Sequence, residues 1–217
     1  MKCINYTPLH VAAYYSNFKL FHEIYAKAKD KYPKDENGWT PFHLAADNGN
    51  MEICQFLIAN TTNNSPKSKI GNTPLHGAAE NGHFEVFKII IETVEGKNPE
   101  NNFGWTPLHY AAEKGHFEIF KLSFLHAKDK NPEDIYGLTP LHLASIFKNL
   151  EVCKFVLENI KDRSPEELAG LKSLSDRLIP TELVYKFCPS QKLVHLSGYF
   201  KHHIWGGQLP KNRCEIL

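Results

Sequence analysis

Histidine is the residue type in this 217-residue chain that could most readily support chemistry, because it occurs twelve times. Neutral imidazole binds transition metals and can act as a general base near neutral pH. Seven of the twelve, however, recur at fixed places in a repeated pattern, which predicts a structural role for them. His195, His202 and His203 lie nearer the C-terminus, without the cysteine or carboxylate spacing of a zinc site. We therefore predict no metal site and no cofactor.

Catalytic signatures are also missing from the sequence. It contains no nucleophile-elbow, phosphate-loop or dinucleotide-binding motif. Its aspartates and glutamates are scattered along the repeated segments, as is typical of a solvated helix face. We therefore predict that the chain is not an enzyme and has no catalytic residues.

The five cysteines do not form a disulfide or metal framework. Cys54 and Cys153 occupy one position of the repeated pattern where other copies have phenylalanine, so we expect both to be buried. The segment from Cys214 to Leu217 resembles a prenylation box, although its second residue is a glutamate rather than an aliphatic residue. A lipid anchor on Cys214, a C-terminal peptide for a strand-adding groove and a chance ending all remain open.

A tetrapeptide of the form Thr-Pro-(Leu/Phe)-His recurs five times at intervals of 33 residues. Its threonines are Thr7, Thr40, Thr73, Thr106 and Thr139. Threonine favours the position just before a helix, and proline favours the first helical position, where its missing amide hydrogen costs nothing. Histidine then falls at the third helical position, from which a side chain can reach back to the cap. Each tetrapeptide therefore predicts a helix start.

A second helix follows within each period. Gly49, Gly82 and Gly115 are placed to end the first helix in a left-handed conformation. The next segment is amphipathic, as in residues 84–91, where apolar residues recur at helical spacing. A polar stretch and a glycine-containing turn then lead to the next threonine. The period thus describes two helices and a connecting loop, stacked on copies of themselves.

These residues resemble the ankyrin-repeat family, whose period is 33 residues. The resemblance covers residues 5–163 and implies an all-α solenoid of stacked helix-turn-helix units joined by β-hairpin-like loops. We predict five ankyrin repeats in residues 1–163. Residues 164–217 are expected to hold a degenerate sixth repeat that acts as a C-terminal cap, followed by an irregular tail. In this family the motif histidine also ties neighbouring repeats together, which implies a structural role for Thr40, His43, Thr73, His76, Thr106, His109, Thr139 and His142.

The resemblance further implies that a partner binds the concave face, which hairpin tips and the ends of the first helices form. The matching tip positions are Glu36, Asn37, Trp39, Lys69, Ile70, Asn72, Asn102, Phe103, Trp105, Ile135, Tyr136 and Leu138. The matching helix ends are Asp47, Asn48, Glu80, Asn81, Glu113, Lys114, Ile146 and Phe147. Aromatic side chains bury a large area at little entropic cost, so we expect the tip row to contact the partner. The same aromatics could instead pack on the adjacent hairpin and stiffen the stack.

The predicted function is a non-enzymatic protein–protein interaction module. Two alternatives remain open: an adaptor whose residues 172–217 recruit a ubiquitin ligase or other machinery, and a structural piece of a longer ankyrin array. A net charge of +1 gives no electrostatic reason to expect nucleic acid or an anionic membrane as partner. No apolar run is long enough to span a bilayer, and the N-terminus lacks the apolar stretch of a secretory signal. We therefore expect the protein in the cytoplasm or the nucleus.

Overall fold

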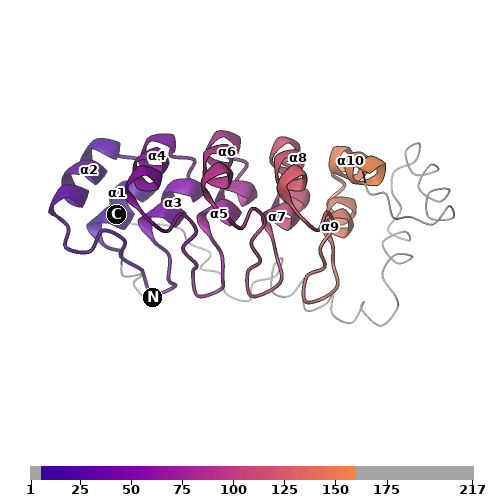
Figure 1. Ribbon diagram of the computed structural model, residues 1–217, viewed down its shortest axis with the longest axis horizontal. Helices are drawn as coiled ribbons and strands as arrows, with labels where there is room; N and C mark the ends of the chain where they lie inside the picture. Colours follow the sequence, from indigo (N-terminus) through magenta and orange to yellow (C-terminus); the bar gives the residue numbers. More distant parts are fainter. Residues whose placement is uncertain (1–5, 160–217) are drawn as a thin grey trace.

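The computed structural model describes residues 6–159, in which five pairs of helices stack in a single row (Figure 1). The first helices are α1 (Pro8–Tyr14), α3 (Pro41–Asp47), α5 (Pro74–Glu80), α7 (Pro107–Lys114) and α9 (Pro140–Ile146). The second helices are α2 (Phe18–Lys27), α4 (Met51–Asn60), α6 (Phe84–Thr93), α8 (Phe117–His126) and α10 (Leu150–Asn159). Figure 1 shows the second helices along the upper edge and the connecting loops projecting downward. The fold is an all-α repeat solenoid, as the sequence predicted.

The first helices are only seven or eight residues long, which is too short for stability in isolation. Each is fixed at its start by a capping box between the threonine before the helix and the histidine of its first turn. In the third repeat the amide of Thr73 donates to Nδ1 of His76 at 3.0 Å. The tetrapeptide therefore starts a helix and provides a hydrogen-bond acceptor for a backbone amide at the N-terminal end of that helix.

The turn between the two helices of a repeat requires a left-handed residue. Gly49 has φ +69°, and a Cβ placed there would lie 2.5 Å from Nδ1 of His83 in the next repeat. Ser16 and Lys148 hold the corresponding positions at the two ends of the described stack with φ 55° and 61°. A side chain in this left-handed conformation costs about 1 kcal/mol. Glycine suits the interior turns because it avoids this cost and because it leaves room for the side chain of the next repeat.

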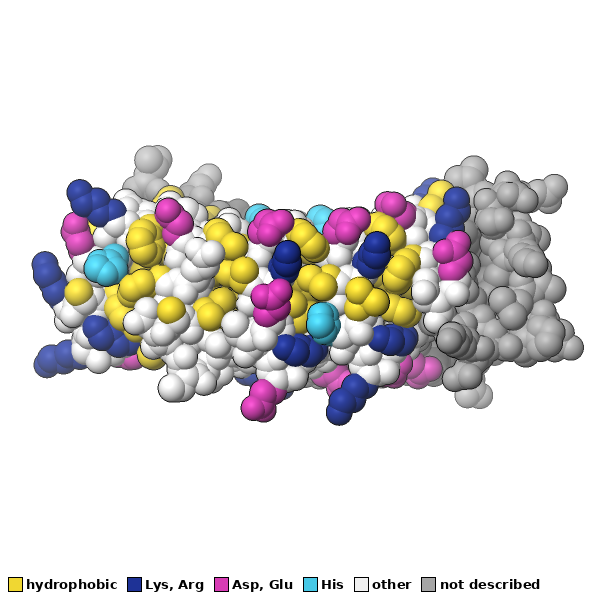
Figure 2. All heavy atoms as spheres, turned by 45° about the horizontal axis from the view of Figure 1, so that its top comes forward, with side chains coloured by type: hydrophobic (Ala, Val, Ile, Leu, Met, Phe, Trp, Pro, Cys, Tyr) yellow, Lys and Arg dark blue, Asp and Glu magenta, His cyan; other side chains and the backbone are white. Residues whose placement is uncertain are grey.

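The core runs through the stack as a continuous layer. Paired alanines of the first helices, such as Ala45 and Ala46, are fully buried and allow the helices to approach closely. Cys54 and Cys153 are buried free thiols, as the sequence predicted. Seen from the side of the second helices, apolar side chains form a band along the row with charged side chains among and around them (Figure 2).

A lysine stabilises the C-terminal end of three second helices. Lys31, Lys97 and Lys130 stand at one position of the repeat, and the ammonium group of Lys97 donates to the carbonyl of Ile91 at 2.6 Å. A cation at this end also complements the negative pole of the helix dipole. The second repeat has Asn64 at this position, and its buried Oδ1 accepts no hydrogen bond from any residue between 6 and 159.

Replacing Asn64 with lysine should raise the free energy of unfolding by about 1 kcal/mol, because the new ammonium group can bond the last carbonyls of α4. Asn64→Ala is the matched control, since it removes the unbonded oxygen without supplying a cation. Urea unfolding of the full chain measures both effects. Equal stability of the two variants would contradict a role for the charge.

Candidate partner-binding site

The hairpin tips are joined to one another by backbone hydrogen bonds. Each tip donates an amide hydrogen to a carbonyl oxygen of the preceding tip. The bonds run from Lys69 N to Asn37 O (2.8 Å), from Asn102 N to Ile70 O (2.9 Å) and from Ile135 N to Phe103 O (3.1 Å). The tips of four consecutive repeats are therefore held at fixed spacing by the main chain itself, independently of what their side chains are.

Each tip also has an internal support. In the first tip, Oδ1 of Asp35 accepts the amide hydrogens of Asn37 and Trp39 at 2.8 and 2.7 Å. Asn101 and Asp134 make the same pair of bonds in the third and fourth tips, whereas in the second tip Oγ of Ser68 accepts the amide hydrogen of Asn72 at 3.1 Å. A side-chain acceptor of this kind closes an Asx turn, so the tip residues project from a preformed loop.

The motif histidines connect each first helix to the tip that follows it. Their Nδ1 atoms accept the threonine amides, so the ring hydrogen resides on Nε2, which donates to a carbonyl 29 residues ahead. These bonds are His10 to Trp39 O (2.9 Å), His43 to Asn72 O (2.9 Å), His76 to Trp105 O (3.1 Å) and His109 to Leu138 O (3.3 Å). Thr139 and His142 form the same capping pair in the fifth repeat. The residues expected to be structural therefore lie at the joints between repeats.

Burial keeps these imidazoles neutral. Removal from water lowers the pKa of His43 to about 4, of His76 to about 3 and of His109 to about 4, although the bond to the carbonyl acts in the opposite direction. The pKa of His10 is lowered for the same reason. A neutral ring is also the form that the bonding requires, because protonation would place a hydrogen on Nδ1 against the threonine amide.

The residues expected to bind a partner divide into three groups by exposure. Glu36, Asn37, Lys69, Ile70, Asn81, Asn102, Lys114 and Ile135 are exposed. Trp39, Asn48, Glu80, Phe103, Glu113, Tyr136, Ile146 and Phe147 are partly buried. Asp47, Asn72, Trp105 and Leu138 are buried, with exposed fractions of 8% or less. The last four can shape the face but offer little surface to a partner.

Trp105 shows why periodicity alone overestimates the contact surface. Its ring packs edge-on against Tyr110 with centroids 4.8 Å apart, and Nε1 donates to Oδ2 of Asp134 at 3.1 Å. Trp39 stands at the same position of its repeat and remains partly exposed. The interpretation that aromatics of this row pack on neighbouring hairpins therefore applies to Trp105.

A buried polar cluster behind the tips was not anticipated from the sequence. Asn101 Nδ2 donates to Oδ1 of Asn72 at 2.8 Å, and Asn72 Nδ2 donates to the hydroxyl of Tyr110 at 3.3 Å. Burial raises the pKa of the Tyr110 hydroxyl, which stays protonated at neutral pH. The signal in the sequence is a pair of unusual residues in adjacent repeats. Asn72 stands where the other repeats have an aromatic residue or leucine, and Tyr110 stands where they have valine, leucine or glycine.

Acidic side chains occupy one position at the ends of three first helices, namely Asp47, Glu80 and Glu113. Asn81 Nδ2 donates to Oδ1 of Asp47 at 2.8 Å, and Glu113 lies 3.5 Å from the ammonium group of Lys114. Burial raises the pKa of Glu113; Glu80 also raises it, while Lys114 lowers it. Beside the tips, the helix ends thus form a row that is predominantly acidic.

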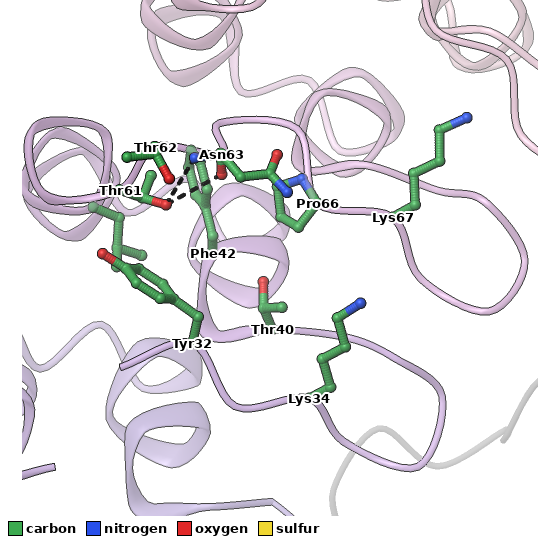
Figure 3. Close-up of a pocket in the computed structure, with 10 residues that line it drawn as sticks. Tyr32, Lys34, Thr40, Phe42, Thr61, Thr62, Asn63, Pro66 and Lys67 are labelled. Atoms are coloured by element: carbon green, nitrogen blue, oxygen red, sulfur yellow. Dashed lines mark hydrogen bonds between the residues drawn. The ribbon is translucent and has the colours of Figure 1, made fainter. Parts of the chain in front are cut away.

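A separate open cavity of about 260 Å³ lies between the loops of the first two repeats (Figure 3). Figure 3 shows Tyr32, Phe42 and Thr61 around the hollow and the side chains of Lys34 and Lys67 directed away from it. It contains none of the exposed tip residues. Within residues 6–159, no group of three histidine, cysteine, aspartate or glutamate side chains is placed to bind a metal ion.

Stacked helical pairs, projecting tips and bridging histidines define a repeat solenoid with a row of loops along one edge. A family model described as "Ankyrin repeats (3 copies)" matches residues 9–99 and 93–165. These matches cover more than half of the sequence, and the chain belongs to the ankyrin-repeat family. Ankyrin repeats are generally protein–protein interaction modules. No curated protein matches the chain. Among the described helices, none is both long and apolar enough to cross a membrane.

Acid should destabilise the fold through the buried histidines. Their pKa is 6.5 when unfolded and about 3 to 4 when folded, so the unfolded chain takes up protons first. Their contribution is complete above pH 6.5 and is lost as pH falls toward 4, at about 2 kcal/mol per histidine by pH 5. Urea unfolding at pH 7.5 and 5.0 measures the loss.

The variant His76→Gln tests the assignment, because glutamine can cap the helix but does not titrate. It should lose about 2 kcal/mol less than the unmodified chain between the two pH values. His22→Gln, at an exposed position on α2, is the matched control for replacing an imidazole outside the capping motif. If His76→Gln is as sensitive to acid as the unmodified chain, another group causes the loss.

Proposed function

We propose that this chain is a non-enzymatic binding module that holds a partner protein along the row of hairpin tips and first-helix ends. The observation that carries the proposal is the backbone bonding between tips, which orders several loops together before any partner arrives. Loops that are already ordered lose little entropy on binding, so a larger share of the contact energy becomes affinity.

The apolar content of the tips increases along the row. The first tip presents Glu36 and Asn37, whereas the last presents Ile135 and Tyr136. Ile135 is 60% exposed and Ile70 is 38% exposed, although both are large apolar residues. Such side chains gain most from burial against a partner, so we propose that the principal anchors are Ile70 in the second tip and Ile135 in the fourth.

The acidic side chains at the helix ends favour a partner that places basic side chains opposite them. Glu80 and Glu113 are partly buried beside the tips, and a lysine or arginine of the partner would be attracted to them. Raising sodium chloride from about 50 to 500 mM should therefore weaken binding several-fold by screening. The variant Glu80→Gln should bind more weakly at low salt and show a smaller salt dependence. A salt dependence that the variant retains in full would contradict this assignment.

The tip anchors can be tested without disturbing the stack, because both isoleucines are exposed. A partner captured by the full chain is identified by mass spectrometry, and its dissociation constant is measured by calorimetry. Ile70→Ser and Ile135→Ser together should raise that constant about tenfold or more, at unchanged melting temperature. Leu125→Ser on α8 is the matched control, since Leu125 is 65% exposed but lies on a second helix. Equal affinity of both variants would exclude the tips as the binding surface.

The remaining predictions depend on residues outside the described part of the chain. The sixth repeat, the adaptor segment 172–217 and the candidate prenylation site Cys214 all fall there. We also propose residence in the cytoplasm or nucleus. The free thiols of Cys54 and Cys153 in the core are compatible with a reducing compartment.

A further inference from the structure

The side of the first repeat that faces away from the second repeat resembles the interface between repeats. We call it the leading face and define it by Pro8, Val11, Leu20, Glu23 and Ile24. Leu20 is 41% exposed. Pro8 is also exposed, and Val11 and Ile24 are partly exposed.

Leu20 shows most clearly that this face is not covered in the way that the other repeats are. The residues at its position in the other repeats are Ile53 (0% exposed), Val86 (2%), Ile119 (1%) and Val152 (1%). Ile53 lies one helical turn before Phe56, whose ring packs on Phe21 and Tyr25 of the preceding repeat, so the cover at this position comes from the preceding repeat. The first repeat has kept the apolar side chain at this position, although no helical pair within residues 6–159 covers it.

Two other positions behave in the same way. Pro8 is exposed, whereas the prolines at its position in the other four repeats are buried. Ile24 is partly exposed, whereas Leu57 and Ile90 at its position are no more than 1% exposed. A terminal repeat normally carries a polar outer face for solubility. These apolar residues therefore continue the established interface between repeats rather than end it.

One residue of the leading face departs from this pattern and indicates the chemistry of the partner. In the second repeat, Phe56 packs edge-on against the rings of Tyr25 and Phe21 in the repeat before it, with centroids 4.9 and 6.1 Å apart. The first repeat has Glu23 at the position of Phe56. A pair stacked in front would therefore meet a carboxylate where the other repeats have an apolar side chain.

We propose that the leading face binds an ankyrin-type helical pair of another protein, stacked in register, with a lysine or arginine opposite Glu23. The apolar residues supply burial, as they do between the other repeats, and the ion pair selects among helical pairs of similar shape. This proposal concerns the end of the stack and does not depend on binding at the tips.

The test supplies such a pair within the chain. A copy of residues 40–72 replaces residues 1–6, which keeps the 33-residue register, and in this copy Ile58 is changed to lysine to face Glu23. Hydrogen exchange of the α2 amides should slow about tenfold or more relative to the unmodified chain, because covering α2 suppresses its local opening. A second chimera retains Ile58 in the copy and should protect α2 less. Failure of both chimeras to slow exchange overturns the proposal.

Leu20→Lys separates a specific interface from general stabilisation. In the unmodified chain it should leave the melting temperature nearly unchanged, because Leu20 is exposed, whereas in the chimera it should lower that temperature by several degrees. Leu125→Lys is the matched control and should be neutral in both chains. Glu23→Gln should lower stability only in the chimera that carries the lysine. Equal effects of Leu20→Lys in both chains overturn the proposal. It also fails if sedimentation equilibrium shows the unmodified chain to be a dimer that Leu20→Lys dissociates, because a second copy would then occupy the face.

Discussion

The neutral imidazole of the repeated tetrapeptide bonds in two directions, and the remaining structure depends on it. One ring nitrogen accepts the amide that begins its own helix, and the other donates to the carbonyl that ends the next tip. Helices of seven or eight residues have little stability alone, so the bond that caps each helix is supported by the bond that ties it to its neighbour. Local structure and stacking are thus coupled within a single side chain, and both require that it carry no charge.

Much of the fold could be predicted because the repeat makes each position testable five times. The spacing of the tetrapeptide gave the helix starts, and the position shared by Cys54 with phenylalanines predicted its burial. The candidate site was harder to predict, because a position in the repeat defines where a side chain begins but not what covers it. Trp39 and Trp105 share one position, yet Trp105 is buried because Tyr110 and Asp134 from its surroundings pack on it.

Departures from the repeat had effects that single repeats do not reveal. Asn72 and Tyr110 differ from the residues at their positions in other repeats, and they bond each other across the interface between repeats, with Asn101 bonded to both. Asn64 is the opposite case, since it replaces a lysine and no described neighbour has changed to bond its oxygen. Sequence reasoning that treats each repeat separately misses the pair of Asn72 and Tyr110, because the two residues lie about one period apart.

The turn between paired helices places a limit on how the units of this chain could be reordered. The glycine of one unit leaves the space that the imidazole of the following unit fills, as Gly49 does for His83. Ser16 carries a Cβ at that place, and the unit after it has the smaller Asn50 instead of histidine. Moving the first unit in front of the third by recombination would bring a Cβ against an imidazole. The units are therefore not interchangeable modules, and their order along the gene is constrained by the shapes of successive neighbours.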